Sequence, residues 1–218
     1  MPIFPEARRN MVENQLRPSR ILDERVLAAM GSVPRELFVP KVLRGVAYAD
    51  EDLHLPDGRR LIEPLALARM LQEADTRPSD VVLLVGCDTG YAAAVVAHLA
   101  ATVILAQPDP AAAERVQSAL DSRQIANAVV SVATDPLVGL DEQAPFDVIL
   151  VLGSVPERPD ALCHQLGELG RLVAVLDRGR LGKMTIWTRI GDTFGQREIA
   201  DTNISPLPRP HSAPRFVF

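Results

Sequence analysis

A short glycine turn is the part of this sequence best suited to chemistry. Residues 86–90 read GCDTG, and they join the apolar run Val81–Val85 to an alanine-rich segment that begins at Tyr91. A buried strand, a glycine turn and a helix in this order are typical of a nucleotide-type cofactor loop, because glycine lets the backbone approach a ligand closely. Asp88 stands where such loops usually have a second glycine. The turn therefore predicts a cofactor loop that carries one additional charged side chain.

The spacing within this turn argues against one class of enzyme. Gly86, Asp88 and Tyr91 occupy the three glycine positions of the dinucleotide fingerprint, and two of the glycines are missing, so a NAD enzyme is not indicated. Asp88 either approaches a bound cofactor, or makes an Asx turn or caps the helix that starts near Tyr91. Cys87 is read as a small buried side chain, with a reactive thiol near a helix N-terminus as the alternative.

Composition excludes several other functions. The net charge is −5 and aromatic residues make up 4% of the chain, whereas nucleic-acid-binding surfaces are rich in Lys, Arg and stacking aromatics. The two cysteines, Cys87 and Cys163, are expected to be reduced thiols in a cytoplasmic protein. The four histidines are scattered without the spacing of metal ligands, so we predict no metal site; they are His54, His98, His164 and His211.

The N-terminus and the hydropathy pattern bear on localisation. The first sixteen residues contain four charged side chains and no apolar segment, which is unlike a signal peptide. No apolar run reaches the roughly 18–20 residues needed to cross a bilayer. We therefore expect a soluble cytoplasmic protein that does not bind membranes, and a monomer, since no obvious dimerisation helix is present.

The elements that must position the glycine turn fall into two parts. Residues 5–45 have helical periodicity, with Asp23 as an N-cap and Gly31 as the stop signal of one helix. Residues 47–64 are acidic and turn-rich, which predicts a surface loop, and Leu65–Ala74 returns to a helical pattern. We assign residues 1–79 to a helical segment with this loop, and residues 80–218 to the core, the whole forming a single compact domain.

In residues 80–218, apolar strands alternate with helices. This alternation predicts a doubly wound α/β fold with a mostly parallel sheet covered on both faces. The expected strands are Val81–Val85, Thr102–Ala106, Ala128–Ala133, Phe146–Leu152 and Leu169–Leu176, with a terminal hairpin of Lys183–Ile190 and Phe194–Ala200. The expected helices are Tyr91–Leu99, Ala111–Arg123 and Asp160–Gly167. In the Pro-rich tail that follows, Phe216–Phe218 are expected to pack against the body.

Ligands of such sheets bind beyond the carboxyl ends of the strands, at the point where the strand order reverses. Here those ends lie near Gly86, Gln107, Thr134 and Leu152. The pattern alone leaves a plain Rossmann domain open as an alternative to other doubly wound folds.

Longer motifs resemble one family. The segments MVENQLRP (11–18), DERVLAAMGSVPRELFVP (23–40) and AYADEDL (47–53) resemble the N-terminal region of protein-L-isoaspartate O-methyltransferases. VLLVGCDTGY (82–91), APFDVILV (144–151) and LGELGRLVAVL (166–176) are similar to its cofactor strand, fourth strand and fifth strand. The resemblance implies a seven-stranded, Rossmann-like S-adenosylmethionine methyltransferase fold with an N-terminal helical extension. It also implies methyl transfer to the side-chain carboxylate of isoaspartyl residues in damaged protein.

The resemblance implies a cofactor site with three departures. The implied cofactor-binding positions are Gly86, Cys87, Asp88, Gly90, Gln107 and Asp135. Asp88 replaces a glycine, Gln107 replaces the acidic residue that accepts hydrogen bonds from the ribose, and Leu84 replaces an acidic residue in the first strand. A neutral acceptor in place of a charged one costs about 1–2 kcal/mol of binding. Gln107 is otherwise an ordinary polar residue at a strand end.

The substrate loop departs as well. The family reads Gly-Gln-Thr-Ile-Ser-Gln-Pro where residues 58–64 read GRRLIEP, so Arg60 takes the Thr position and Ile62 takes the Ser position. These two are the implied catalytic positions, with the family hydroxyl lost at Ile62. Arg59, Arg60, Pro64 and Ser154 are the expected substrate-binding residues, since an arginine can hold a carboxylate bidentately. The alternatives are a solvated arginine pair and a structural Ser154.

Two functions remain open on this basis. One is an active S-adenosylmethionine-dependent carboxyl methyltransferase whose partner is an isoaspartyl protein or peptide. The other is a non-catalytic descendant that keeps the fold as a binding or interaction module, with cofactor binding weakened or lost. A fold alone does not decide between them, because function resides in the site.

Overall fold

The N-terminal part of the chain forms a helical layer. A computed structural model describes residues 3–208, and all structural statements below concern that range. Its first elements are α1 (Ile3–Asn10), which continues directly into a π-helical turn η1 (Met11–Leu16), and α2 (Glu24–Ser32). Two 3-10 turns follow, η2 (Arg35–Phe38) and η3 (Lys41–Val46). As predicted, Asp23 caps α2, because its Oδ1 accepts a hydrogen bond from the Arg25 N–H at 2.9 Å.

A small hairpin and one helix connect this layer to the main sheet. The strands β1 (Leu53–His54) and β2 (Arg60–Leu61) are antiparallel, with Leu53 opposite Leu61. They lie in the stretch expected to be a plain surface loop. That expectation was incomplete, since Leu53, Leu61 and Ile62 are buried and anchor the hairpin in the core. Helix α3 (Pro64–Ala74) follows at once, with its proline at the first helical position, where no backbone N–H is needed.

The core is a seven-stranded sheet in the order β5-β4-β3-β6-β7-β8-β9. Its strands are β3 (Val81–Val85), β4 (Thr102–Gln107), β5 (Ala128–Val132), β6 (Phe146–Val155), β7 (Leu166–Leu176), β8 (Lys183–Ile190) and β9 (Thr193–Asp201). Strands β3 to β7 pair in parallel, and β8 and β9 close the sheet as antiparallel neighbours. This confirms the doubly wound α/β fold and the terminal hairpin.

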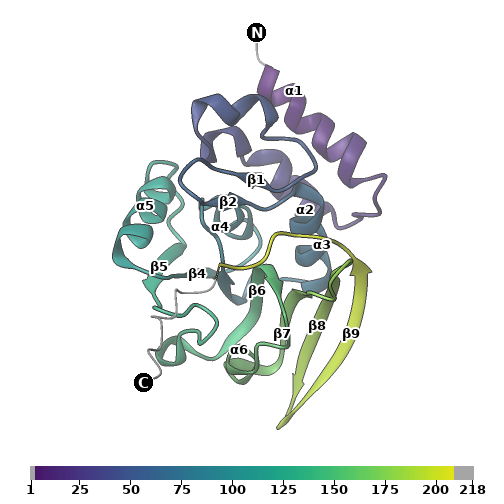
Figure 1. The fold of residues 1–218 in the computed structure, drawn as a ribbon, viewed down its shortest axis with the longest axis vertical. Coiled ribbons are helices and arrows are strands. Elements are labelled where there is room, and N and C mark those ends of the chain that lie inside the picture. Colours follow the sequence, from purple (N-terminus) through teal and green to yellow (C-terminus); the bar gives the residue numbers. More distant parts are fainter. Residues whose placement is uncertain (1–2, 209–218) are drawn as a thin grey trace, which may run out of the picture.

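Helices complete the layers (Figure 1). They are α4 (Tyr91–Val96), α5 (Pro110–Asp121) and α6 (Asp160–His164), with a 3-10 turn η4 (Asp141–Gln143) before β6. Strand side chains alternate between two hydrophobic clusters. Val82 and Leu84 belong to the cluster that includes the N-terminal helices, and Leu83 and Val85 belong to the cluster that includes α6. Burial on both faces explains why these strands are continuously apolar.

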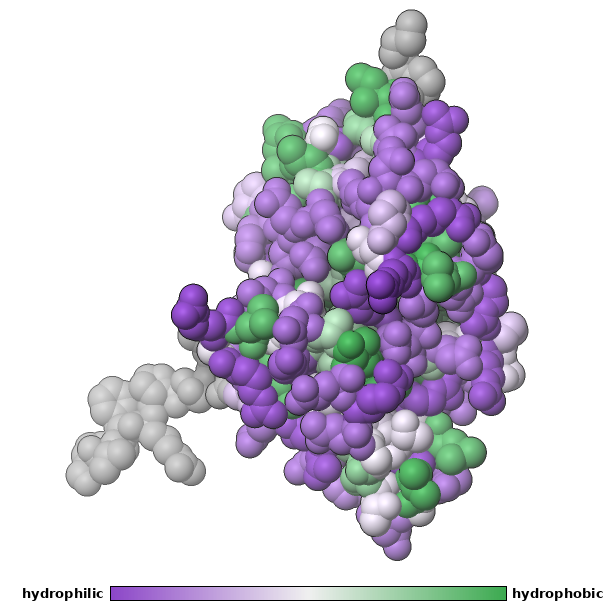
Figure 2. Space-filling view, turned by 90° about the vertical axis from the view of Figure 1, so that its right-hand side faces the viewer, coloured by the Kyte–Doolittle hydropathy of each residue, from purple (hydrophilic) through white to green (hydrophobic). Residues whose placement is uncertain are grey.

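The two edges of the sheet differ. At one edge, β9 is mostly exposed and carries Arg197 and Glu198. At the other edge, β5 exposes Val129 and Val132, with 52% and 47% of their surface accessible. Between them, the backbone N–H of Val130 donates to Oε1 of Gln117 on α5, at 3.1 Å. On the face shown in Figure 2, hydrophilic residues predominate and the hydrophobic ones form separate small patches.

The segment after β9 crosses the sheet. Figure 1 shows it running from the end of β9 above β6 toward β4. Pro206 forms a parallel bridge with Ser154, whose N–H donates to Ser205 O at 3.0 Å and whose carbonyl accepts from Leu207 N at 3.0 Å. We call residues 202–208 the strap. The predicted packing of Phe216–Phe218 lies outside the described residues.

Several boundaries differ from those predicted. Helix α2 runs through Gly31 to Ser32, so the glycine is not its stop signal. Helix α4 ends at Val96, because the chain then turns at His98 and Leu99 through backbone bonds to Val95 and Val96. Strand β6 extends to Val155 through its pairing with β7 and the strap. Among residues 3–208, no helix combines the length and the apolar character needed to cross a membrane.

Candidate functional site

The glycine turn begins where β3 ends. Gly86 and Gly90 have φ angles of +80° and +82°, the left-handed region that favours glycine. Gly90 is the N-cap residue of α4 and makes no side-chain cap bond, whereas the Thr89 hydroxyl accepts the Tyr91 N–H at 3.4 Å. Because β4 lies on one side of β3 and β6 on the other, the turn sits at the point where the strand order reverses. This is where a doubly wound sheet binds its ligand.

Asp88 connects the turn to the substrate loop. Its Oδ2 accepts the backbone N–H of Arg60 at 3.1 Å, and the side chain is half-buried. The prediction that Asp88 caps α4 is wrong, because the N-cap residue of this helix is Gly90, which makes no side-chain cap bond. Burial raises the pKa of the Asp88 carboxyl, while the charge of Arg60 and the Arg60 backbone hydrogen bond oppose the rise. The aspartate therefore joins two loops that are 28 residues apart in the chain.

A hydrogen bond joins Gln107, at the end of β4, to Cys87 in the glycine turn. Nε2 of Gln107 donates to the Cys87 carbonyl at 3.1 Å, and only 2% of the Gln107 surface is exposed. The amide therefore holds the turn against the end of β4. Cys87 is 3% exposed, and burial raises the pKa of its thiol to about 11. A thiol in that state is a buried filler and not a nucleophile.

Leu84 and Asp135 occupy two further positions that the resemblance assigns to the cofactor site. Leu84 is completely buried in β3 and packs in the core, so the family's acidic residue is replaced by an ordinary core side chain. Asp135, beyond the end of β5, is exposed, and its Oδ1 accepts the Leu137 N–H at 3.0 Å. This bond closes a local turn of the type that aspartate favours.

Arg60 is not a solvated loop residue. Only 8% of its surface is exposed, and Nη1 donates to Ser205 O at 2.7 Å while Nη2 lies 3.5 Å from Leu152 O. Its Nε has no hydrogen-bond partner within the described part of the chain. The guanidinium thus lies between β6 and the strap, beside the glycine turn and beyond the carboxyl ends of β3 and β4. We call this place the crevice.

The other expected substrate-loop residues lie apart from Arg60. Arg59 donates from Nε to Asp57 Oδ2 at 2.8 Å, so its guanidinium is engaged in a local ion pair. Pro64 is buried at the first position of α3. Ile62 is 7% exposed, and its carbonyl accepts Nη2 of Arg35 at 2.6 Å. The structure thus brings together Arg60, Asp88 and the turn, but not Arg59.

Arg35 is a residue of the site that the sequence reasoning missed. Its side chain is fully buried, donates from Nε to Ala47 O at 2.5 Å, and lies 4.8 Å from the ring centroid of Tyr91. Together with the bond to Ile62 it joins the substrate loop to the first turn of α4. Burial lowers the pKa of Arg35. The motif VPRELFVP, which contains Arg35, was the signal that could have predicted it. A charged residue between apolar ones is often buried, and it then needs hydrogen-bond partners.

Leu207 was missed as well. It is 8% exposed, and a Cβ built on Gly86 would stand 2.4 Å from its Cδ1. Ser154, beneath the strap, is also 8% exposed. Two hollows of about 220 and 120 Å³ adjoin it, both lined by Ser154, Asp177 and Pro206. Ser154 therefore faces surface hollows while its backbone secures the strap.

The implied cofactor is S-adenosylmethionine, and the crevice is the place where a fold of this kind would hold it. The backbone fits, because Gly86 and Gly90 adopt the conformations that such a turn needs, at the correct end of the sheet. Two residues of the chain itself lie close to this backbone, since a Cβ on Gly86 would stand 2.4 Å from Cδ1 of Leu207 and a Cβ on Gly153 would stand 3.0 Å from Nη2 of Arg60. The crevice therefore has the backbone frame of a cofactor site, with Leu207 and Arg60 beside it.

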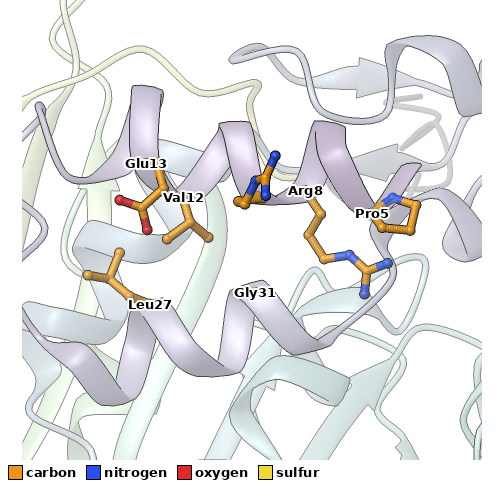
Figure 3. Close-up of a pocket in the computed structure, with 7 residues that line it drawn as sticks. Pro5, Arg8, Val12, Glu13, Leu27 and Gly31 are labelled. Atoms are coloured by element: carbon orange, nitrogen blue, oxygen red, sulfur yellow. The ribbon is translucent and has the colours of Figure 1, made fainter. Parts of the chain in front are cut away.

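Another hollow of about 360 Å³ lies away from this crevice, between α1 and α2 (Figure 3). Val12 and Leu27 face each other across it, and Arg8 reaches Ser32 O at 2.9 Å. Two of the charged side chains that line it are engaged in ion pairs with residues outside the lining, Arg8 with Glu36 and Glu13 with Arg17, so we do not assign the hollow a role in catalysis. Within residues 3–208, no group of three or more His, Cys, Asp and Glu side chains is placed to hold a metal ion.

Known proteins match the chain over most of its length. The family model described as Protein-L-isoaspartate(D-aspartate) O-methyltransferase matches residues 6–207. A protein-L-isoaspartate O-methyltransferase of Koribacter versatilis is 40% identical over 205 residues, covering 94% of this chain and 91% of that protein. One of Methylorubrum extorquens is 39% identical over 213 residues, covering 96% and 91%.

Solved structures agree on the fold. A protein-L-isoaspartate O-methyltransferase superposes with a TM-score of 0.80 at 21% identity, covering 93% of this chain and 66% of that chain. A putative Plasmodium falciparum protein of the same kind, in complex with S-adenosyl-L-homocysteine, superposes with a TM-score of 0.75 at 18% identity, covering 92% and 98%. The match across residues 6–207 and the curated relatives at about 40% identity establish that the chain belongs to the protein-L-isoaspartate O-methyltransferase family.

Proposed function

We propose that the protein is an S-adenosylmethionine-dependent methyltransferase that acts on the side-chain carboxylate of isoaspartyl residues in damaged protein. The observation that carries this proposal is the family match over residues 6–207, which includes the glycine turn. The left-handed Gly86 and Gly90 at the strand-order reversal support it independently. Bound S-adenosylmethionine supplies an electrophilic methyl group.

The chain's own part in this reaction is to bind and orient the acceptor. A carboxylate is nucleophilic at neutral pH, so the site requires no general base, and proximity, alignment and exclusion of water account for the rate. Arg35 contributes by fixing Ile62 and Ala47, which positions the substrate loop beside the glycine turn. We propose that the peptide lies in the hollows beside Ser154, where Arg180 and Asn203 also line the wall.

The test is methyl transfer from radiolabelled S-adenosylmethionine to a synthetic isoaspartyl peptide. The matched control is the same peptide with a normal aspartyl linkage. We expect base-labile label on the isoaspartyl peptide only. Label on neither peptide, at millimolar cofactor and with folded protein, would exclude the proposed activity. Label at a rate near that of relatives would show that the family hydroxyl, replaced by Ile62, is dispensable.

A second candidate is a family descendant without catalysis that acts as a binding or interaction module. It is favoured by the closeness of Leu207 to Gly86 and of Arg60 to Gly153, because these side chains lie at the end of the sheet where a cofactor would bind. It is favoured also by Gln107, whose amide is engaged with Cys87 O and offers the ribose no carboxylate. Calorimetry with S-adenosylhomocysteine separates the two candidates. Binding without methyl transfer, or no binding at all, supports the second.

We further propose that the protein works as a cytoplasmic monomer that binds neither nucleic acid nor membrane. The acidic net charge of −5 and the free, buried Cys87 and Cys163 support this assignment. Light scattering on the purified chain tests the oligomeric state, and a mass of twice the chain mass would refute it.

A further inference from the structure

Two segments distant in the chain meet in front of the glycine turn. Arg60 comes from β2 and Leu207 comes from the strap, and each is only 8% exposed. Their contacts are with the two strands that flank the reversal of strand order. Leu207 lies against Gly86 after β3, and Nη2 of Arg60 lies against Gly153 in β6. Both side chains therefore occupy the place where this fold binds its ligand.

The contacts of Arg60 are those that a cationic ligand would make. A guanidinium is always charged and only donates, and here its two terminal nitrogens face Ser205 O and Leu152 O. Its backbone N–H meanwhile donates to Oδ2 of Asp88 at 3.1 Å. S-adenosylmethionine also carries positive charge, on its ammonium and sulfonium groups. A cofactor entering the crevice thus competes with Arg60 for acceptors and with Leu207 for apolar surface.

The end of the strap that carries Leu207 is held less firmly than its beginning. Residues 202–205 are fixed by several bonds, among them Thr202 N to Gly182 O at 3.0 Å and Ser205 N to Asp52 Oδ2 at 2.7 Å. Beyond Ser205, one backbone bond joins the described residues to the sheet, from Leu207 N to Ser154 O. An end attached in this way can open without unfolding the sheet, and opening would release Leu207 from Gly86.

We propose that Arg60 and Leu207 form an internal plug in the cofactor crevice, and that S-adenosylmethionine binds only when the plug is displaced. The inference rests on the proposed function, because it takes the crevice to be the cofactor site. The apparent cofactor affinity is then the intrinsic affinity multiplied by the fraction of molecules whose plug is open. Arg60, at the family's Thr position, sets that fraction for this chain.

The experiment measures S-adenosylhomocysteine binding by calorimetry for the native chain, Arg60→Thr, Leu207→Ala and the double variant. Loss of charge-assisted bonds to two carbonyls should raise affinity by about tenfold or more in Arg60→Thr. Leu207→Ala should raise it by opening the other half of the plug, and the double variant should bind most tightly. Arg197→Thr is the control, because that arginine is exposed on β9 and pairs with Glu73; its affinity should equal that of the native chain.

A second readout does not depend on any variant. Hydrogen exchange of the Leu207 amide, which is bonded to Ser154 O, reports whether the strap is in place. Saturating S-adenosylhomocysteine should accelerate that exchange in the native chain. If Arg60→Thr and Leu207→Ala fold but bind no more tightly than the native chain, the plug does not exist. Slower or unchanged exchange of Leu207 in the bound state would equally overturn it.

These outcomes are separate from those of the proposed function. Methyl transfer by the native chain with no gain of affinity in either variant would keep the function and refute the plug. Tighter binding in the variants with no transfer to an isoaspartyl peptide would keep the plug and refute the function.

Discussion

Gln107→Glu, which places the family's acidic residue at the end of β4, should weaken the folded protein in a pH-dependent way. Gln107 donates to the Cys87 carbonyl at 3.1 Å and is 2% exposed, so an ionised carboxylate there would face a carbonyl oxygen without water. Loss of the bond costs about 1 kcal/mol, and leaving the carbonyl and a buried charge unpaired costs about 1–3 kcal/mol more. The introduced carboxyl escapes part of this cost by staying protonated, in which form it can donate to the same carbonyl.

The sign of the pH dependence follows from this. The folded pKa of the introduced carboxyl is raised above its unfolded value of about 4.3, so the folded state holds an additional proton between the two values. Stability of the variant, relative to the native chain, therefore falls as pH rises through that window. We expect a deficit below about 1 kcal/mol at pH 5 and of about 2–3 kcal/mol at pH 8.

Urea unfolding followed by fluorescence of the single tryptophan, Trp187, measures this deficit, because that side chain is fully buried in β8. The matched control is Gln107→Met, which keeps the length of the side chain but has neither donor nor charge. Its deficit, about 1–2 kcal/mol for the unpaired Cys87 carbonyl, should be constant with pH. Parallel pH curves for the two variants would show that position 107 is not desolvated and would refute the reasoning.

Three further predictions concern stability. Arg35→Met should lower the free energy of unfolding by about 2–4 kcal/mol, since two buried carbonyls lose their donor; a change below 1 kcal/mol in urea unfolding would contradict the bonding role of Arg35. Burial and neighbouring carboxylates raise the pKa of Glu63 to about 7, so the free energy of unfolding should decline as pH rises from about 4.5 to 7. Glu63→Gln should remove that decline, and an unchanged pH dependence in the variant would contradict the prediction. Gly86→Ala should lower the free energy of unfolding by at least about 1–2 kcal/mol because φ is +80°. Adding Leu207→Ala should restore the part of that loss caused by collision of the new Cβ with Leu207. If thermal unfolding shows no such restoration, backbone strain accounts for the whole loss.

Much of the sheet was predictable because its signals are local. A strand buried on both faces must be apolar throughout, so Val81–Val85 and Phe146–Leu152 were identifiable from composition alone. Asp23 was identifiable as a cap because its bond reaches only two residues along the chain. The exact ends of elements were less predictable, since β6 owes its last residues to partners in β7 and the strap.

The interior of the site was not predictable for a physical reason. Arg60 lies in a polar, turn-rich stretch where charged residues are normally solvated, and its burial depends on Ser205 O, which is 145 residues further along the chain. The contact of Leu207 with Gly86 depends likewise on the path of the strap across β6. No local pattern encodes either contact. The family departures at Asp88, Gln107 and Ile62 were visible in the sequence, but their bonding partners were not.

The unlike edges of the sheet have a consequence for the behaviour of this protein at high concentration. An open strand edge invites strand addition from another molecule, and that is a common start of aggregation. On β9 the side chains Arg197 and Glu198 place charge along the edge, which disfavours a second copy. On β5, where Val129 and Val132 are exposed, Gln117 takes the Val130 N–H and removes a donor that an incoming strand would need. Gln117 on α5 thus protects the more exposed edge of the sheet from strand addition.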